Sequence, residues 1–169
     1  MSGSPKTAIV TGASQGIGSG IVKAFVQRGF NVVATARKMT DSEEVAASSQ
    51  VALVDGDIGE PATASRIVDT ALSRFNSIDA VVNNAGIFFT KPFTEYTAED
   101  FRSLISTNVE GFLYLTQRSI RQMLVQKTGG SIVTITGALA RNPIRGVTAA
   151  VPMLTKGGLE TITRHLAME

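Results

Sequence analysis

Short apolar runs alternate with helical patterns along the whole chain, and this alternation constrains the fold more than any other feature of the sequence. The runs have the length and β-branched content of buried strands. Parallel strands need a crossover between them, and the crossover is usually a helix. The alternation therefore predicts an α/β fold, a doubly wound parallel sheet with helices on both faces. The expected strands are residues 7–10, 31–36, 50–54, 80–82 and 131–136.

Helical patterns fill the intervals between these strands. Ile17, Val22 and Val26 fall on one helical face, and Gly29 follows as a stop signal. Thr97, with Asp100 three residues later, has the form of a helix cap. The expected helices are residues 17–26, a short polar helix at 41–48, and longer helices at 61–75, 98–126 and 152–169.

Length and composition fit one globular domain. The chain has 169 residues, of which 43% are hydrophobic and 18% are charged. This is enough for one domain with a substantial core over residues 1–169. The last helical pattern runs to Glu169 without a stop signal. We therefore expect a chain that is truncated or processed at its C-terminus, after the helix that follows the fifth strand.

Composition also excludes several classes of protein. The net charge is only +2, with Lys and Arg scattered among acidic residues, whereas a nucleic-acid binder needs a concentrated basic face. There are no cysteines, which is typical of a reducing compartment. No apolar run approaches the roughly 18 residues that cross a bilayer, and no signal-peptide pattern is visible. We expect a cytoplasmic protein with no nucleic-acid partner, no membrane span and no metal site.

The stretch TGASQGIG, residues 11–18, joins the first expected strand to the first expected helix. Glycines at such a turn let backbone N–H groups approach a pyrophosphate at the positive end of the helix. Gly12, Gly16 and Gly18 supply them here, although their spacing differs from the GxGxxG pattern. The turn therefore predicts a dinucleotide site in a Rossmann-type fold, with a tight turn that binds nothing as the alternative.

The end of the second strand distinguishes NADP from NAD. An acidic side chain there would bind the ribose hydroxyls and repel a 2′-phosphate. This chain has Ala36 followed by Arg37 and Lys38. Because Arg37 can form a charge-assisted bond to a phosphate, the sequence favours NADP(H), with NAD(H) as the alternative.

Together these motifs resemble those of the short-chain dehydrogenases/reductases, and the similarity spans essentially the whole chain. TGASQGIG is similar to the family's cofactor turn, NNAG at residues 83–86 to its sheet-stabilising signature, and DGDI at 55–58 to the stretch whose aspartate contacts adenine. The resemblance implies hydride transfer between a nicotinamide cofactor and a small carbonyl or alcohol, and assembly into homodimers or homotetramers. The expected cofactor-binding residues are Gly12, Ser14, Gln15, Gly16, Ile17, Gly18, Arg37, Asp57, Ile58, Asn84, Ala85, Gly86 and Lys156.

The resemblance also assigns two residues to the catalytic centre. Asn108 falls where the family keeps an asparagine that supports a proton-relay water, and Lys156 where it keeps a lysine that holds the nicotinamide ribose. An asparagine in a long apolar helix is costly unless it is hydrogen-bonded, which favours a specific polar role for Asn108. We therefore expect Asn108 and Lys156 to be the catalytic residues.

Two positions depart from the family pattern. Pro152 stands where the family has its catalytic tyrosine, four residues before Lys156, and Gly137 stands where it has a serine. Proline in the first turn spares the helix but removes the acid, and general acid–base catalysis is worth about 10²–10⁴-fold in rate. Neither Tyr96 nor Tyr114 has the spacing to Lys156 that would replace it.

An active enzyme would need another acid. Lys156 is the favoured candidate, because a positively charged nicotinamide ring nearby would lower its pKa. A substrate group or a water near Asn108 are alternatives, while Thr155 is expected to point elsewhere and Thr136 to face away from Gly137. The sequence therefore favours an NADP(H)-dependent oxidoreductase with a non-standard proton relay. It leaves open a catalytically silent cofactor-binding protein that acts as a sensor or partner subunit.

Overall fold

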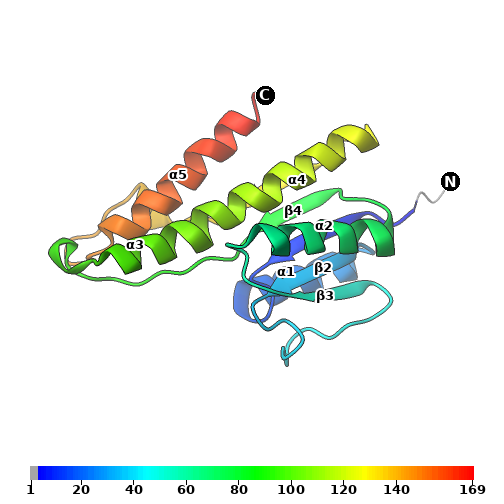
Figure 1. Ribbon diagram of the computed structural model, residues 1–169, viewed down its shortest axis with the longest axis horizontal. Helices are drawn as coiled ribbons and strands as arrows, with labels where there is room; N and C mark the ends of the chain where they lie inside the picture. Colours follow the sequence, from blue (N-terminus) through cyan, green and yellow to red (C-terminus); the bar gives the residue numbers. More distant parts are fainter. Residues whose placement is uncertain (1–3) are drawn as a thin grey trace.

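A five-stranded parallel sheet forms the centre of the fold in the computed structural model, which describes residues 4–169 (Figure 1). The strand order is β3-β2-β1-β4-β5. Because the order reverses at β1, the carboxyl ends of β1 and β4 border a crevice, where ligands bind in sheets of this kind. The predicted fold class is confirmed. The strands are β1 (Thr7–Thr11), β2 (Asn31–Ala36), β3 (Val51–Asp55), β4 (Ala80–Asn83) and β5 (Ser131–Thr134).

Helices cover both faces of the sheet, and α5 carries the chain away from it to the C-terminal end (Figure 1). Over residues 4–169, no helix is both long and apolar enough to span a membrane. The helical segments are α1 (Gly16–Gln27), α2 (Pro61–Phe75), the 3₁₀ turn η1 (Phe93–Glu95), α3 (Ala98–Leu104), the π-helical η2 (Ile105–Glu110), α4 (Gly111–Gln126), the 3₁₀ turn η3 (Ala138–Ala140) and α5 (Ala150–Leu166).

Alternate residues of the strands β1 to β4 belong to two hydrophobic clusters, one on each face of the sheet. Ile9 and Val33 point toward α2 and α4, where Ile67 and Leu115 are also fully buried. In these four strands the next residue points the other way, toward α1, as Val10 does. This period-two division is expected for strands that are buried on both faces.

The short polar helix predicted at residues 41–48 is wrong, because this segment has no helical structure. The Ser42 hydroxyl accepts the backbone N–H groups of Glu44 and Val45, each at 3.2 Å. The Ser48 hydroxyl accepts the N–H of Gln50 at 3.2 Å. Serine hydroxyls that satisfy nearby backbone groups give the chain an alternative to a helix.

Several predicted boundaries also shift. β5 ends at Thr134 rather than Thr136 because its partner β4 ends at the paired Asn83. The last helix begins at Ala150, two residues before Pro152. Ile17 was expected on the core face of its helix but is 66% exposed, since the first turn of α1 lies over the crevice rather than over the sheet.

The fully buried Ile67 provides a test of the core. We expect Ile67→Ala to lower the free energy of unfolding by about 2–5 kcal/mol, because it removes buried methyl groups and leaves a cavity. The matched control is Ile144→Ala, at a position that is 60% exposed, which should change stability by less than about 0.5 kcal/mol. Urea denaturation followed by circular dichroism measures both, and equal losses would contradict the assigned core.

Candidate functional site

The glycine turn between β1 and α1 has the backbone geometry that its sequence predicts. Gly12 has a φ of +62° and Gly16 a φ of +60°. A Cβ atom on Gly12 would lie 2.9 Å from Cα of Ala85, so the turn and the loop after β4 approach too closely for a side chain there. The N-cap residue of α1 is Gln15, and its side chain makes no capping hydrogen bond. The first N–H groups of α1 are therefore available to an anion.

Thr11 and Asn84 join the carboxyl ends of β1 and β4. The Thr11 hydroxyl accepts the backbone N–H groups of Asn84 at 3.0 Å and Ala85 at 2.9 Å. The Asn84 amide donates to the carbonyl oxygens of Thr11 at 2.9 Å and Gly12 at 3.1 Å. The same bonds therefore hold both the glycine turn and the NNAG loop.

A cavity of about 800 Å³ opens at this edge of the sheet, within the usual range for ligand pockets. It brings together every predicted cofactor-binding residue except Lys156. The cavity is also lined by five residues that were not predicted from the sequence: Thr11, Thr35, Gly56, Ile87 and Thr107. The position of Thr11, at the end of the strand before the glycine turn, was a usable signal. Thr107 lies on η2 directly before Asn108, whose predicted place at the catalytic centre was a usable signal too.

Asn108 lies on the π-helical segment η2 and is 1% exposed. Its Oδ1 accepts the N–H of Ile87 at 2.8 Å, and its Nδ2 donates to the Ile87 carbonyl at 3.1 Å and to the Thr155 hydroxyl at 2.9 Å. The π turn is a common feature of functional sites. The predicted specific polar environment of Asn108 is therefore present, and it ties η2 to the loop after β4 and to α5.

Lys156 lies on α5, directly after Thr155. Its Nζ donates to the carbonyl oxygen of Ile135 at 3.0 Å. A Cβ on Gly86 would lie 3.0 Å from Nζ of Lys156 and 3.1 Å from Oδ1 of Asn108, so both polar groups face a residue that lines the cavity. Burial lowers the pKa of Lys156 from its ordinary value of 10.5. The lysine is therefore a better proton donor near neutral pH than an exposed one.

The two positions that depart from the family pattern are both beside Lys156. Pro152 is buried in the first turn of α5, and its carbonyl accepts the Thr155 hydroxyl at 2.7 Å. A Cβ on Gly137 would lie 3.8 Å from the sulfur of Met153 and 4.0 Å from Cγ of Lys156. The expectation that Thr155 points elsewhere needs correction, because its hydroxyl bridges Asn108 and Pro152.

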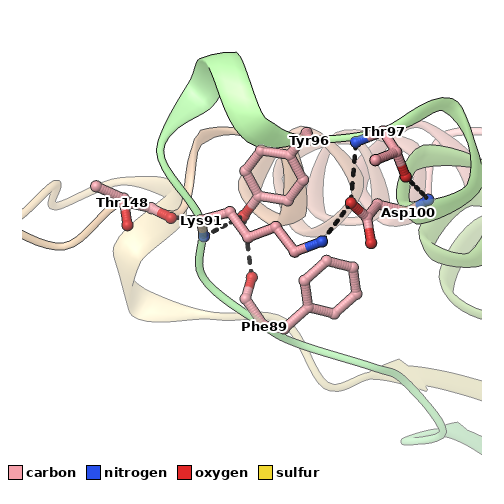
Figure 2. A network of polar contacts seen from close by, with 6 residues as sticks. All are labelled: Phe89, Lys91, Tyr96, Thr97, Asp100 and Thr148. Carbon is pink, nitrogen blue, oxygen red and sulfur yellow. Dashed lines mark hydrogen bonds and ion pairs between the residues drawn. The ribbon is translucent and has the colours of Figure 1, made fainter.

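The loop after β4 is fastened to the segment that precedes α5 (Figure 2). The Tyr96 hydroxyl lies within hydrogen-bond distance of the carbonyl oxygens of Phe89, at 3.0 Å, and Thr148, at 3.4 Å. The N–H of Lys91 also donates to the Thr148 carbonyl at 3.2 Å. Figure 2 shows the Lys91 ammonium paired with the carboxylate of Asp100, at 2.6 Å. These contacts fix the start of α5, and hence Lys156, relative to the edge of the sheet.

The sheet topology, the glycine turn and the crevice define a dinucleotide-binding α/β protein, and the chain belongs to the short-chain dehydrogenases, whose family model matches residues 6–169. It is 33% identical to the sorbitol dehydrogenase of Cereibacter sphaeroides, over 95% of this chain and 66% of that protein. It is 31% identical to the NADP-dependent (R)-specific alcohol dehydrogenase of Lentilactobacillus kefiri, over 97% of this chain and 66% of that protein.

Solved structures show the same relationship. The crystal structure of a 3-ketoacyl-(acyl-carrier-protein) reductase from Brucella melitensis, complexed with NADH, aligns with a TM-score of 0.91 at 29% identity. The alignment covers 98% of this chain and 70% of that one. The chain thus spans about two thirds of the length of the relatives that it matches.

The lowered pKa of Lys156 has a consequence for stability. The unfolded chain binds the proton more tightly than the folded one between the lowered pKa and 10.5. Stability due to this residue therefore rises with pH through that window and is lost as the pH falls through the folded-state pKa. We expect the unsubstituted chain to gain unfolding free energy relative to Lys156→Met as the pH rises from neutral toward 10.5.

Urea denaturation at a series of pH values measures this difference. Lys6→Met, at an exposed position, controls for the loss of one positive charge. If the difference in unfolding free energy between the unsubstituted chain and Lys156→Met did not change with pH, the burial of this ammonium group would be contradicted.

Proposed function

We propose that the cavity at the carboxyl ends of the strands binds NADP(H), with NAD(H) as the alternative ligand. The single observation that carries this is the uncapped N-terminus of α1, which opens into the cavity behind two glycines with positive φ. Backbone N–H groups in this arrangement suit a pyrophosphate. Arg37 and Lys38 line the same cavity beyond the end of β2, where Ala36 stands in place of an acidic residue.

The predicted cofactor-binding residues divide along the cavity according to what they can offer. We assign the glycine turn to the pyrophosphate, Arg37 to the 2′-phosphate, and Asp57 with Ile58 to the adenine. One carboxylate oxygen of Asp57 accepts the N–H of Gly59 at 2.9 Å, and within residues 4–169 the other has no hydrogen-bond donor. Gly86 and Lys156 mark the opposite end of the site, next to Asn108.

The reaction that we propose is the interconversion of a small carbonyl and its alcohol. A bound nicotinamide dinucleotide supplies or accepts the hydride at the carbonyl carbon. Lys156 donates the proton to the carbonyl oxygen and recovers it from solvent, and its lowered pKa favours this transfer near neutral pH. Asn108 positions the adjacent loop and α5 through Ile87 and Thr155. Assembly into homodimers or homotetramers is a further part of this proposal.

A second candidate function follows from Pro152 and Gly137. Neither residue can exchange a proton, and both lie where the family resemblance places the tyrosine and the serine. The alternative is a catalytically silent protein that binds the cofactor as a sensor or partner subunit. It keeps the same cavity and the same ligand, so binding experiments do not separate it from the oxidoreductase and turnover experiments do.

The cofactor proposal predicts the effect of Arg37→Ala. Loss of a charge-assisted bond to the 2′-phosphate should raise the Kd for NADPH about ten- to a hundredfold. The Kd for NADH should stay within about twofold, because NADH has no such phosphate. Fluorescence titration measures both. Arg28→Ala, at the opposite end of α1, is the matched control for a lost positive charge. An equal rise in the Kd values for NADPH and NADH in Arg37→Ala would contradict the assignment of Arg37 to the 2′-phosphate.

The catalytic proposal predicts the effect of Lys156→Met. Removal of the proton donor should lower kcat for carbonyl reduction by about 10²–10⁴-fold and flatten the pH–rate profile. A panel of small carbonyls and alcohols, followed by absorbance at the nicotinamide band, provides the measurement, with Lys6→Met as the control. Equal turnover by Lys156→Met would exclude this relay. Binding of NADPH without turnover of any substrate would support the silent alternative.

A further inference from the structure

The segment that follows β2 is held in place at three points. The Met39 side chain is fully buried. Thr40 donates its N–H and its hydroxyl to the two carboxylate oxygens of Asp55, at 2.8 Å and 2.6 Å. The Ser42 hydroxyl donates to the carbonyl oxygen of Ser14, in the glycine turn, at 2.7 Å. These contacts fix a short surface segment that has no helix or strand of its own.

The Asp55 carboxylate holds Thr40 close to the end of β2, where Arg37 and Lys38 follow the strand. Asp55 is the last residue of β3 and is paired in register with Ala36, the last residue of β2. Arg37 and Lys38 follow Ala36 directly and line the cavity. Thr40 and Asp55 are not among the described residues that line it. The hydrogen bonds from Thr40 lower the pKa of Asp55 below its ordinary value.

Arg37 needs such support because it is exposed on a turn. A long side chain that binds a ligand loses rotamer freedom, at a cost of about 0.5–1.5 kcal/mol for each immobilised side chain. A mobile backbone beneath it would add to that cost. A backbone that is already fixed on both sides of Lys38 reduces the entropy lost when the guanidinium binds a phosphate.

We propose that Thr40 and Asp55 are positioning residues for cofactor specificity, and that their paired hydrogen bonds hold the Arg37–Lys38 turn at the cavity rim for a 2′-phosphate. This inference rests on the proposed binding of NADP(H). It assigns to two residues outside the cavity a selective effect on the phosphorylated dinucleotide.

Thr40→Val tests the inference without changing any charge. Valine has the shape of threonine and keeps the N–H bond to Asp55, but it removes the 2.6 Å bond from the hydroxyl. We expect the Kd for NADPH to rise about two- to tenfold and the Kd for NADH to stay within about twofold, as measured by fluorescence titration. Thr40→Ser, which retains both hydrogen bonds, should bind both ligands as the unsubstituted chain does.

A double-mutant cycle with Arg37→Ala separates positioning from a general structural effect. If Thr40 acts through Arg37, Thr40→Val should have no further effect on NADPH in the Arg37→Ala background. Independent, additive effects of the two substitutions would overturn the inference. The inference would also be overturned if Thr40→Val raised the Kd values for NADPH and NADH by the same factor while the circular dichroism spectrum stayed unchanged.

The proposed function and this inference fail in different ways. If the unsubstituted chain binds neither NADPH nor NADH, the proposed function is wrong and this inference is wrong with it. If the unsubstituted chain prefers NADPH and Thr40→Val has the same preference, only the role of Thr40 and Asp55 is excluded.

Discussion

The bonds between Thr11 and Asn84 are the interaction on which the rest of the site depends. At the carboxyl ends of β1 and β4, strand pairing ends and backbone groups need other hydrogen-bond partners, because buried polar groups without partners are costly. The Thr11 hydroxyl accepts two N–H groups there, and the Asn84 amide donates to two carbonyl oxygens. Two side chains thus hold open a cavity in which backbone N–H groups at the start of α1 remain available to a ligand.

Three elements that are distant in the sequence meet at the other end of this cavity. η2 contributes Asn108, the loop after β4 contributes Ile87, and α5 contributes Thr155, and their polar groups satisfy one another. Pro152 fits this arrangement because its position in the first helical turn does not require a backbone donor. The place of Lys156 is therefore maintained even though the preceding turn has no tyrosine.

Much of the fold could be predicted because its signals are local. The buried strands and the long helices have clear periodicity, and Gly12 and Gly16 adopt the positive φ that makes glycine the favoured residue there. The prediction of a helix at residues 41–48 was wrong because a periodic pattern carries no information on side chains that compete for backbone hydrogen bonds. The hydroxyls of Ser42 and Ser48 satisfy backbone groups that a helix would otherwise pair.

The sequence by itself determined the alternation of strands and helices, the position of the glycine turn, and the absence of an acidic residue at Ala36, since each depends on residues close together in the chain. Only the tertiary structure decided that Thr155 contacts Asn108, that Tyr96 lies at the carbonyl of Thr148, and that Thr40 is bound by Asp55. These contacts join residues 15 to 52 positions apart. Their geometry follows from strand order and helix packing, which no local pattern encodes.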